Sequence, residues 1–259
     1  MIAQVIPLSF AGDSRSVRLR ELTGNEEYAV LGAGTPEAIA LLSALLAPAS
    51  PGEEKIDAVD LVAADRDRLL AAVYDNAFGD RIESTLTCSH CRQPFDLDFS
   101  LRQLMETVSY HPAPGDWRLL GEGRFESKTG TSFRLPTGRD ELEVPTLTSG
   151  DVESWLLRRC VPGGAWPDGL EAFEELLDQV APLLDLELLA RCVECAHVNM
   201  VRFDIQSYVL GAVVAERRRL LAEINRLARA YSWSLGEILS LSRSDRRQFV
   251  ELIENEYIT

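Results

Sequence analysis

The sequence predicts an α+β protein built on a discontinuous, ribbon-like core of four cysteines. Cys-x-x-Cys pairs occur at 88–91 and 192–195, and each pair is followed by a short segment in which apolar and polar residues alternate. The last part of the chain carries apolar residues at helical spacing, which predicts a helical C-terminal arm. The chain has 259 residues, 46% of them hydrophobic, so it is large enough to bury a core and too apolar to be disordered throughout.

Residues 1–80 are predicted to form an N-terminal α+β region of short strands followed by helices. Alternation at 17–20 and scattered glycines indicate short strands before residue 34. The pair Thr35-Pro36 is typical of a helix start, and we expect that helix to run through about Leu46. A second helix is expected from about residue 60 to 78, because its apolar residues follow helical spacing and Gly79 can end it.

The two cysteine pairs lie in similar local sequences, which predicts two arms of one ribbon, at 81–100 and 188–205. In each arm a strand follows the cysteine pair, with Phe95-Asp96-Leu97 in the first and Phe203-Asp204-Ile205 in the second. Residues 101–187 are expected to form a mostly helical insertion between the arms. Its elements are predicted as helices near 100–108, 151–159 and 169–180 and a strand near 131–135.

Residues 206–259 are predicted to form the helical arm. An apolar stripe indicates one helix from about 206 to 230, with arginines on its opposite face. The segment Ser234-Leu-Gly-Glu237 matches a capping box that opens a short helix. A last helix is expected to begin at Ser242 or Ser244.

The four cysteines Cys88, Cys91, Cys192 and Cys195 are predicted to bind one structural zinc ion. Two turns with ligands three residues apart supply the four thiolates of a closed tetrahedral site, which leaves no position for a catalytic water. The pairs are separated by about 100 residues, and closing such a loop costs about 4 kcal/mol. Structural zinc contributes on the order of 10–16 kcal/mol in peptides, so the free energy of zinc binding exceeds the cost of closing the loop.

Other interpretations of the cysteines remain open at this point. Two redox dithiols would need exposed thiolates of low pKa, and an iron–sulfur cluster would also use four cysteines. The cysteines could also be simple buried side chains. His90 and His197 lie next to the pairs and could each replace one ligand, although we expect that neither does. Cys160 is expected to be a buried apolar residue.

Composition and motifs exclude several function classes. The net charge of −15 disfavours binding to a phosphate backbone. No apolar run approaches the ~20 residues of a membrane span, and the N-terminus lacks a signal-peptide pattern, so we expect a cytoplasmic protein. With three histidines and no phosphate-binding loop, nucleophile elbow or HExxH motif, we expect no enzyme activity. The segment Arg134–Asp140 is interpreted as a structural turn rather than an interaction loop.

The second half of the chain resembles the baseplate hub assembly chaperone family of T-even-like phages. The resemblance rests on Phe203-Asp204-Ile205 and on the segments 217–231, 233–241 and 246–253. The segment Arg134–Asp140 and the two cysteine pairs are similar to the branch found in contractile injection systems. The resemblance implies a factor that helps to assemble the hub or baseplate of a contractile tail, and it brings no catalytic residues.

From this resemblance we expect partners among baseplate, hub, spike or tail-tube proteins, and a location in the cytoplasm or in a phage-tail-like particle. An amphipathic helical arm can lay its apolar face in a partner's groove. The alternative is a zinc-ribbon adaptor or regulator that binds nucleic acid or other proteins. On the arm, the expected contact residues are Tyr231, Trp233, Arg246, Arg247 and Phe249.

Overall fold

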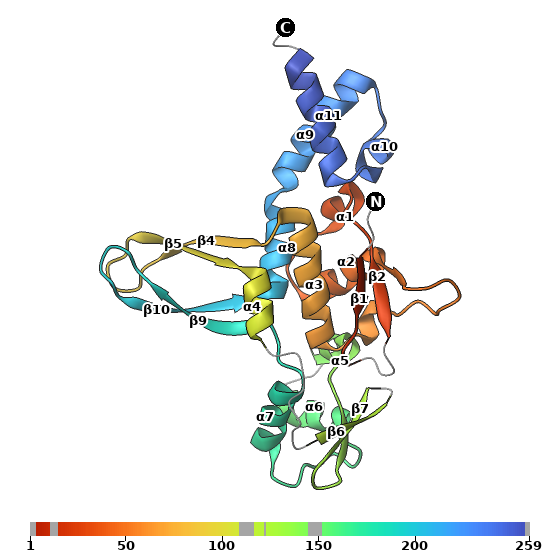
Figure 1. Cartoon of the computed structure of the whole chain (residues 1–259), viewed down its shortest axis with the longest axis vertical. Coiled ribbons are helices and arrows are strands. Elements are labelled where there is room, and N and C mark those ends of the chain that lie inside the picture. Colours follow the sequence, from red (N-terminus) through yellow and green to blue (C-terminus); the bar gives the residue numbers. More distant parts are fainter. Residues whose placement is uncertain (1–3, 11–14, 109–116, 122, 145–151, 257–259) are drawn as a thin grey trace.

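The computed structural model describes residues 4–10, 15–108, 117–121, 123–144 and 152–256. These residues form helices and four small antiparallel sheets, so the predicted α+β class is confirmed. Figure 1 shows a central body from which two β-hairpins project to one side, with the insertion at one end of the long axis and the C-terminal arm at the other. None of the described helices is both long and apolar enough to cross a lipid bilayer.

The central body joins a three-stranded sheet to a set of helices. The helical segments are α1 (Gly24–Ala29), α2 (Thr35–Leu45), a 3-10 turn (Ala58–Asp60) and α3 (Ala63–Phe78), and the strands are β1 (Gln4–Pro7), β2 (Ser16–Leu19) and β3 (Leu46–Pro48). Leu42, Leu45, Leu69 and Leu70 are fully buried in its core. The structure adds α1 where the sequence predicted only strands and turns, because Glu26 accepts a hydrogen bond from the Thr23 backbone N–H and thereby starts a helix.

The two predicted ribbon arms are antiparallel hairpins, each of which leads directly into a helix. The first is β4 (Arg81–Thr87) and β5 (Pro94–Ser100) followed by α4 (Leu101–Thr107), and the second is β9 (Asp185–Arg191) and β10 (Val198–Asp204) followed by α8 (Ile205–Ala215). Ser100 is the N-cap of α4 and Asp204 is the N-cap of α8, so each hairpin ends in a residue that caps the helix after it. Figure 1 shows the hairpins leaving the body and approaching each other at their tips.

The insertion has its own apolar core. Its elements are β6 (Trp117–Gly121), β7 (Arg124–Ser127), β8 (Ser132–Arg134), α5 (Gly138–Glu143), α6 (Val152–Cys160) and α7 (Leu170–Val180). Phe125, Phe133 and Phe173 are buried together in this core. The strand near 131–135 and the helices near 151–159 and 169–180 were predicted, whereas β6, β7 and α5 were not.

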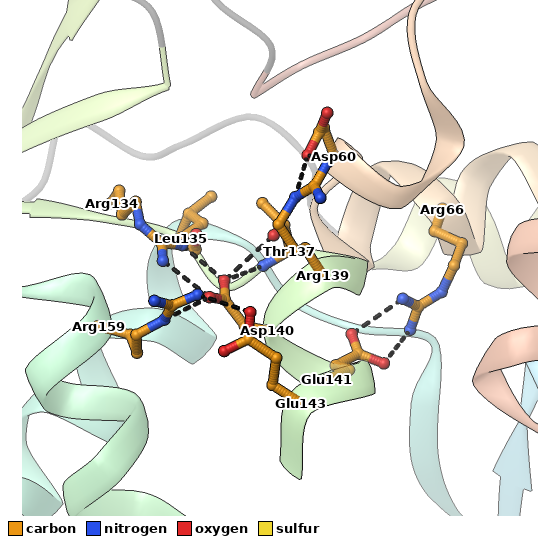
Figure 2. Close-up of polar contacts among 10 residues, drawn as sticks. All are labelled: Asp60, Arg66, Arg134, Leu135, Thr137, Arg139, Asp140, Glu141, Glu143 and Arg159. Atoms are coloured by element: carbon orange, nitrogen blue, oxygen red, sulfur yellow. Dashed lines mark hydrogen bonds and ion pairs between the residues drawn. The ribbon is translucent and has the colours of Figure 1, made fainter. Parts of the chain in front are cut away.

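The segment Arg134–Asp140, which was interpreted as a turn, also begins α5. Figure 2 shows why: the buried Asp140 carboxylate accepts hydrogen bonds from the Thr137 backbone N–H at 2.9 Å and from the Arg134 guanidinium at 2.6 and 2.8 Å. Arg159 of α6 donates to the same carboxylate at 3.3 Å. Asp140 therefore fixes strand β8, helix α5 and helix α6 to one another, which supports the structural interpretation of this segment.

The C-terminal arm consists of α9 (Arg217–Tyr231), α10 (Leu235–Ser240) and α11 (Arg243–Glu256). The expectation of a single helix over 206–230 is corrected, because the helical path is interrupted at Glu216 between α8 and α9. The Glu216 carboxylate instead contacts Arg243 of α11 at 2.6 Å. The capping box at Ser234 and Glu237 is confirmed, and the last helix begins just after Ser242.

Asp140 should stabilise the fold in a pH-dependent way. Although burial alone would raise it, hydrogen bonding to Arg134 and Thr137 lowers the pKa of Asp140 to about 2. Its stabilisation is therefore complete above pH ~4, the unfolded value, and is lost as the pH falls towards 2. Asp140→Asn should lower the free energy of unfolding at pH 7 by about 1.5–3 kcal/mol, as measured by chemical denaturation.

The matched control for this variant is Asp60→Asn, which removes the partner of Arg139 in an exposed ion pair. Exposed pairs contribute about 0–1 kcal/mol, so this control should change little. Equal losses in the two variants would contradict the role assigned to Asp140.

Asp67 of α3 should have the opposite pH dependence. It is buried and accepts a hydrogen bond from the Leu184 backbone N–H at 2.9 Å, and its burial raises its pKa to about 7. The folded state therefore favours the protonated acid, so this contribution is complete below pH ~4 and is lost as the pH rises through 7. Asp67→Asn should raise stability at pH 8 by on the order of 1–3 kcal/mol. A variant that loses stability at pH 8 in thermal or chemical denaturation would contradict this assignment.

Candidate metal centre

The four predicted ligand residues meet at the tips of the two hairpins. Their sulfur atoms all lie within 4.8 Å of one another, although the two pairs are far apart in the chain. The Sγ atoms of Cys88 and Cys195 are 3.7 Å apart, as are those of Cys91 and Cys192. All four are free thiols, since a disulfide would place its two sulfurs about 2.05 Å apart.

Each cysteine pair lies in a tight turn of the same backbone geometry. In the first turn the Cys88 N–H donates to the Gln93 carbonyl and the Arg92 N–H donates to the Cys88 carbonyl. In the second turn the Cys192 N–H donates to the His197 carbonyl and the Ala196 N–H donates to the Cys192 carbonyl. The residue after each second cysteine has a left-handed backbone, with φ of 63° at Arg92 and 59° at Ala196. The two turns thus have matching backbone conformations, which place their cysteines at equivalent positions.

The spacing of the sulfurs fits a four-coordinate ion. Four sulfurs placed about 2.3 Å from a common tetrahedral centre lie about 3.8 Å from one another. Two separations between the turns, both 3.7 Å, agree with that geometry. The residues present could therefore hold a metal ion with an all-sulfur donor set.

The environment of the sulfurs favours at least one thiolate. The backbone N–H of Cys91 is the largest influence on Cys88, and together with the His90 N–H and the Asn199 amide it lowers the pKa of that thiol to about 6. At Cys195 the His197 N–H favours the thiolate, yet burial and the other three sulfurs together raise the pKa of this thiol to about 12. Four thiolates in this space repel one another, and a bound cation would remove that repulsion.

Asn199 of β10 connects the two turns and was not identified from the sequence. Its Oδ1 accepts hydrogen bonds from the backbone N–H and the hydroxyl of Ser89, both at 2.9 Å, and its Nδ2 lies 3.7 Å from the Cys88 sulfur. The only sequence signal for this role is a polar residue at an inward position of an alternating strand. Such partners of the ligands orient metal sites in general.

The remaining candidates lie outside the four-sulfur cluster. The rings of His90 and His197 stack on each other with centroids 5.3 Å apart, so the two hairpin tips also touch through their histidines. Cys160 is buried in the core of the insertion, as expected from the sequence.

The predicted contact residues of the arm fall into two groups. Tyr231, Trp233 and Phe249 form an aromatic cluster with centroids 4.8–5.8 Å apart, and Tyr231 is 36% exposed. Arg247 is partly exposed and lies 3.5 Å from Glu216. Arg246 is 1% exposed and pairs with Glu27 of α1 and with Glu223 of α9. This position makes Arg246 a link between the arm and the body, and its burial keeps it from contact with a partner.

The chain matches a known protein family over most of its length. A family described as T4 bacteriophage base plate protein matches residues 6–259, which is nearly the whole chain. No curated protein and no solved structure matches the chain.

Proposed function

Because the chain belongs to the family of T4 bacteriophage base plate proteins, we propose that it helps to assemble the baseplate or hub of a contractile phage tail or a related injection system. The observation that carries this proposal is the family match, which includes both hairpins and the whole C-terminal arm. The role is non-enzymatic: the chain acts as an assembly chaperone or as a structural part, through contacts with baseplate, hub, spike or tail-tube proteins.

The same proposal includes one structural zinc ion held by Cys88, Cys91, Cys192 and Cys195. The all-sulfur donor set and the 3.7 Å sulfur separations support zinc, which favours closed tetrahedral thiolate sites. Such an ion would join the hairpins at their tips. Since α4 and α8 follow the hairpins directly, the joined tips would also constrain the start of both helices.

The arm supplies the proposed contact surface, formed by Tyr231, Trp233, Arg247 and Phe249. The arm has a small core of its own, with Leu227, Ile238, Val250 and Ile253 buried in it. The aromatic cluster lies at the edge of this core and packs its rings against one another. Aromatic residues that are ordered before binding lose little conformational entropy on binding, which makes them effective anchors for a partner.

The alternative, a zinc-ribbon adaptor that binds nucleic acid, has less support. The net charge of −15 opposes contact with phosphates, and nucleic-acid-binding modules need a basic face. Its signature would be salt-sensitive retardation of DNA or RNA, so strong retardation at low salt would favour it over the assembly role.

The zinc site predicts one zinc ion per purified chain, measured by elemental analysis. Cys91→Ser should lose the ion and lower the thermal midpoint, because one of the four ligands is missing. Cys160→Ser is the matched control, since it removes a buried thiol outside the cluster and should keep the ion. Folded protein without metal, in which the four thiols react freely, would refute the site.

The arm surface predicts that Tyr231→Ala weakens association with the hub at least tenfold. The test co-expresses the chain with the hub, spike and tube proteins of the same tail and measures the affinity of the complex that forms. Leu119→Ser is the control, because it removes an exposed apolar side chain from the insertion instead. If Tyr231→Ala and a deletion of the arm both leave the complex and the assembled particle intact, the proposed contact surface is wrong.

A further inference from the structure

Two helices at opposite ends of the molecule carry charges of opposite sign. Helix α9 contains five arginines and one glutamate, whereas α7 contains four carboxylates and no basic residue. Figure 1 shows α9 in the arm at one end of the long axis and α7 in the insertion at the other end. The two helices therefore do not contact each other within one chain.

The outer face of α9 carries a basic stripe. Arg218 and Arg229 are exposed there, and Ala222 and Asn225 lie exposed between them at helical spacing. This face lies opposite the fully buried Leu227, which packs in the core of the arm. The stripe thus points away from the rest of the arm.

The charge of this stripe is not neutralised by the described residues. Nearby carboxylates are paired with other arginines: Glu216 with Arg243, Glu223 with Arg246 and Glu254 with Arg226. Arg218 and Arg229 form no ion pair or hydrogen bond with any described side chain, which includes the remaining arm carboxylates Glu237, Asp245 and Glu251. Both guanidinium groups are therefore available to a partner.

The outer face of α7 carries an acidic stripe. Glu171, Glu175 and Asp178 are exposed and recur at the spacing of one helix face, opposite the buried Phe173. None of the three carboxylates forms an ion pair or a side-chain hydrogen bond with the described residues.

Two basic side chains belong to elements next to this acidic stripe. Lys128 lines the same surface depression as Glu175, together with the acidic Asp168, and Arg158 belongs to α6, which packs on α7. Four carboxylates of α7 and Asp168 outnumber these two bases, so this end of the insertion remains acidic.

The two stripes also match in form. Each is the exposed face of a helix, and Arg218 and Arg229 lie about 16 Å apart along the axis, against about 10 Å between Glu171 and Asp178. The long arginine side chains can reach inward over the difference, and the small Ala222 between them leaves room for the backbone of a second helix.

We infer that α9 of one chain binds α7 of a second copy, so that copies associate head to tail. Such a contact joins two different faces, and it therefore continues from copy to copy into a ring or a filament. The net charge of −15 opposes association in general, but an end-to-end contact keeps the centres of the two chains far apart. A screening length of about 8 Å at physiological salt then leaves the touching faces as the dominant charges. This inference does not depend on the proposed function.

The first test measures self-association of the purified full chain by sedimentation velocity. We expect oligomers that grow with concentration, and a dissociation constant that rises at least tenfold between about 50 mM and about 500 mM NaCl, because salt screens exposed charges. Arg218→Glu with Arg229→Glu should abolish the oligomers, and so should Glu171→Arg with Asp178→Arg. The control is Arg15→Glu with Arg18→Glu, which changes the net charge as much as the α9 variant, at exposed arginines of the body, and should leave association unchanged.

An equimolar mixture of the two reversed variants should associate again. The acidic α7 of the α9 variant then meets the unchanged α9 of its partner, and the two reversed helices also carry opposite charges. Both variants should keep the thermal midpoint of the original chain, because all four side chains are exposed. If a reversed variant does not fold, Arg218→Gln with Arg229→Gln is measured instead, with the same loss of self-association.

Several results would overturn the inference. These are a chain that stays monomeric at low salt, oligomers that salt does not weaken, an equal loss in the control, and a mixture that stays monomeric. Because the measurement uses the chain alone, its failure would leave the proposed function in the tail untouched.

The second test locates the contact. The photo-crosslinking amino acid p-benzoylphenylalanine is placed at position 222, between the two arginines, or at the exposed position 5 of β1 as the control. Irradiation of the chain at low salt should give a covalent dimer through position 222, joined to a peptide of α7, and none through position 5. A dimer joined to any other part of the chain would overturn the inference.

Discussion

The convergence of four sulfur atoms at the hairpin tips is the constraint on which the rest of the structure depends. Two turns from opposite sides of an insertion place their thiols within 4.8 Å of one another. Without a cation this arrangement would be unfavourable, because thiolates at such distances repel one another. With a cation the same distances become favourable, and two separate hairpins become one rigid projection.

This constraint also explains how the chain can carry a folded insertion between its two ribbon arms. The hairpins lead directly into α4 and α8, and α8 packs in the same core as the N-terminal helices. The insertion has a hydrophobic core of its own, so its side chains do not have to pack in the core of the body. The arm is fastened separately, through Arg246 and Glu27, at the other end of the molecule. The architecture is thus a body with three attachments: the paired hairpins, the insertion and the C-terminal arm.

Much of the fold could be predicted from local patterns. The strand at 81–87, the helix ended by Gly79 and the capping box at Ser234 all depend on residues close in sequence, and the structure contains each of them. The four cysteines were identifiable for the same reason, since their spacing within each pair is local. Their approach across the insertion followed from the chemistry of the donor set, because thiol pairs in matching turns suit one shared ion.

The features that were missed have two causes: short local capping boxes, Thr23 to Glu26 and Thr137 to Asp140, in segments expected to be strands or turns, and contacts between residues far apart in the chain. The short helices α1 and α5 are too short to be stable alone, and each is fixed by a carboxylate that pairs with an arginine outside the helix, Glu26 with Arg20 and Asp140 with Arg134. Arg246 was expected among the contact residues of the arm, whereas it is buried, because it pairs with Glu27, from the opposite end of the chain, and with Glu223. Asn199 was missed because nothing in the sequence shows that it faces Ser89.

X-ray absorption at the zinc edge of the purified full chain would show directly whether the four sulfurs share one ion. A site closed by the four cysteines should give four sulfur neighbours at about 2.3 Å around each zinc ion and no nitrogen or oxygen in the inner sphere. A spectrum with fewer than four sulfurs, with histidine scattering from His90 or His197, or with no zinc signal from folded protein would contradict it.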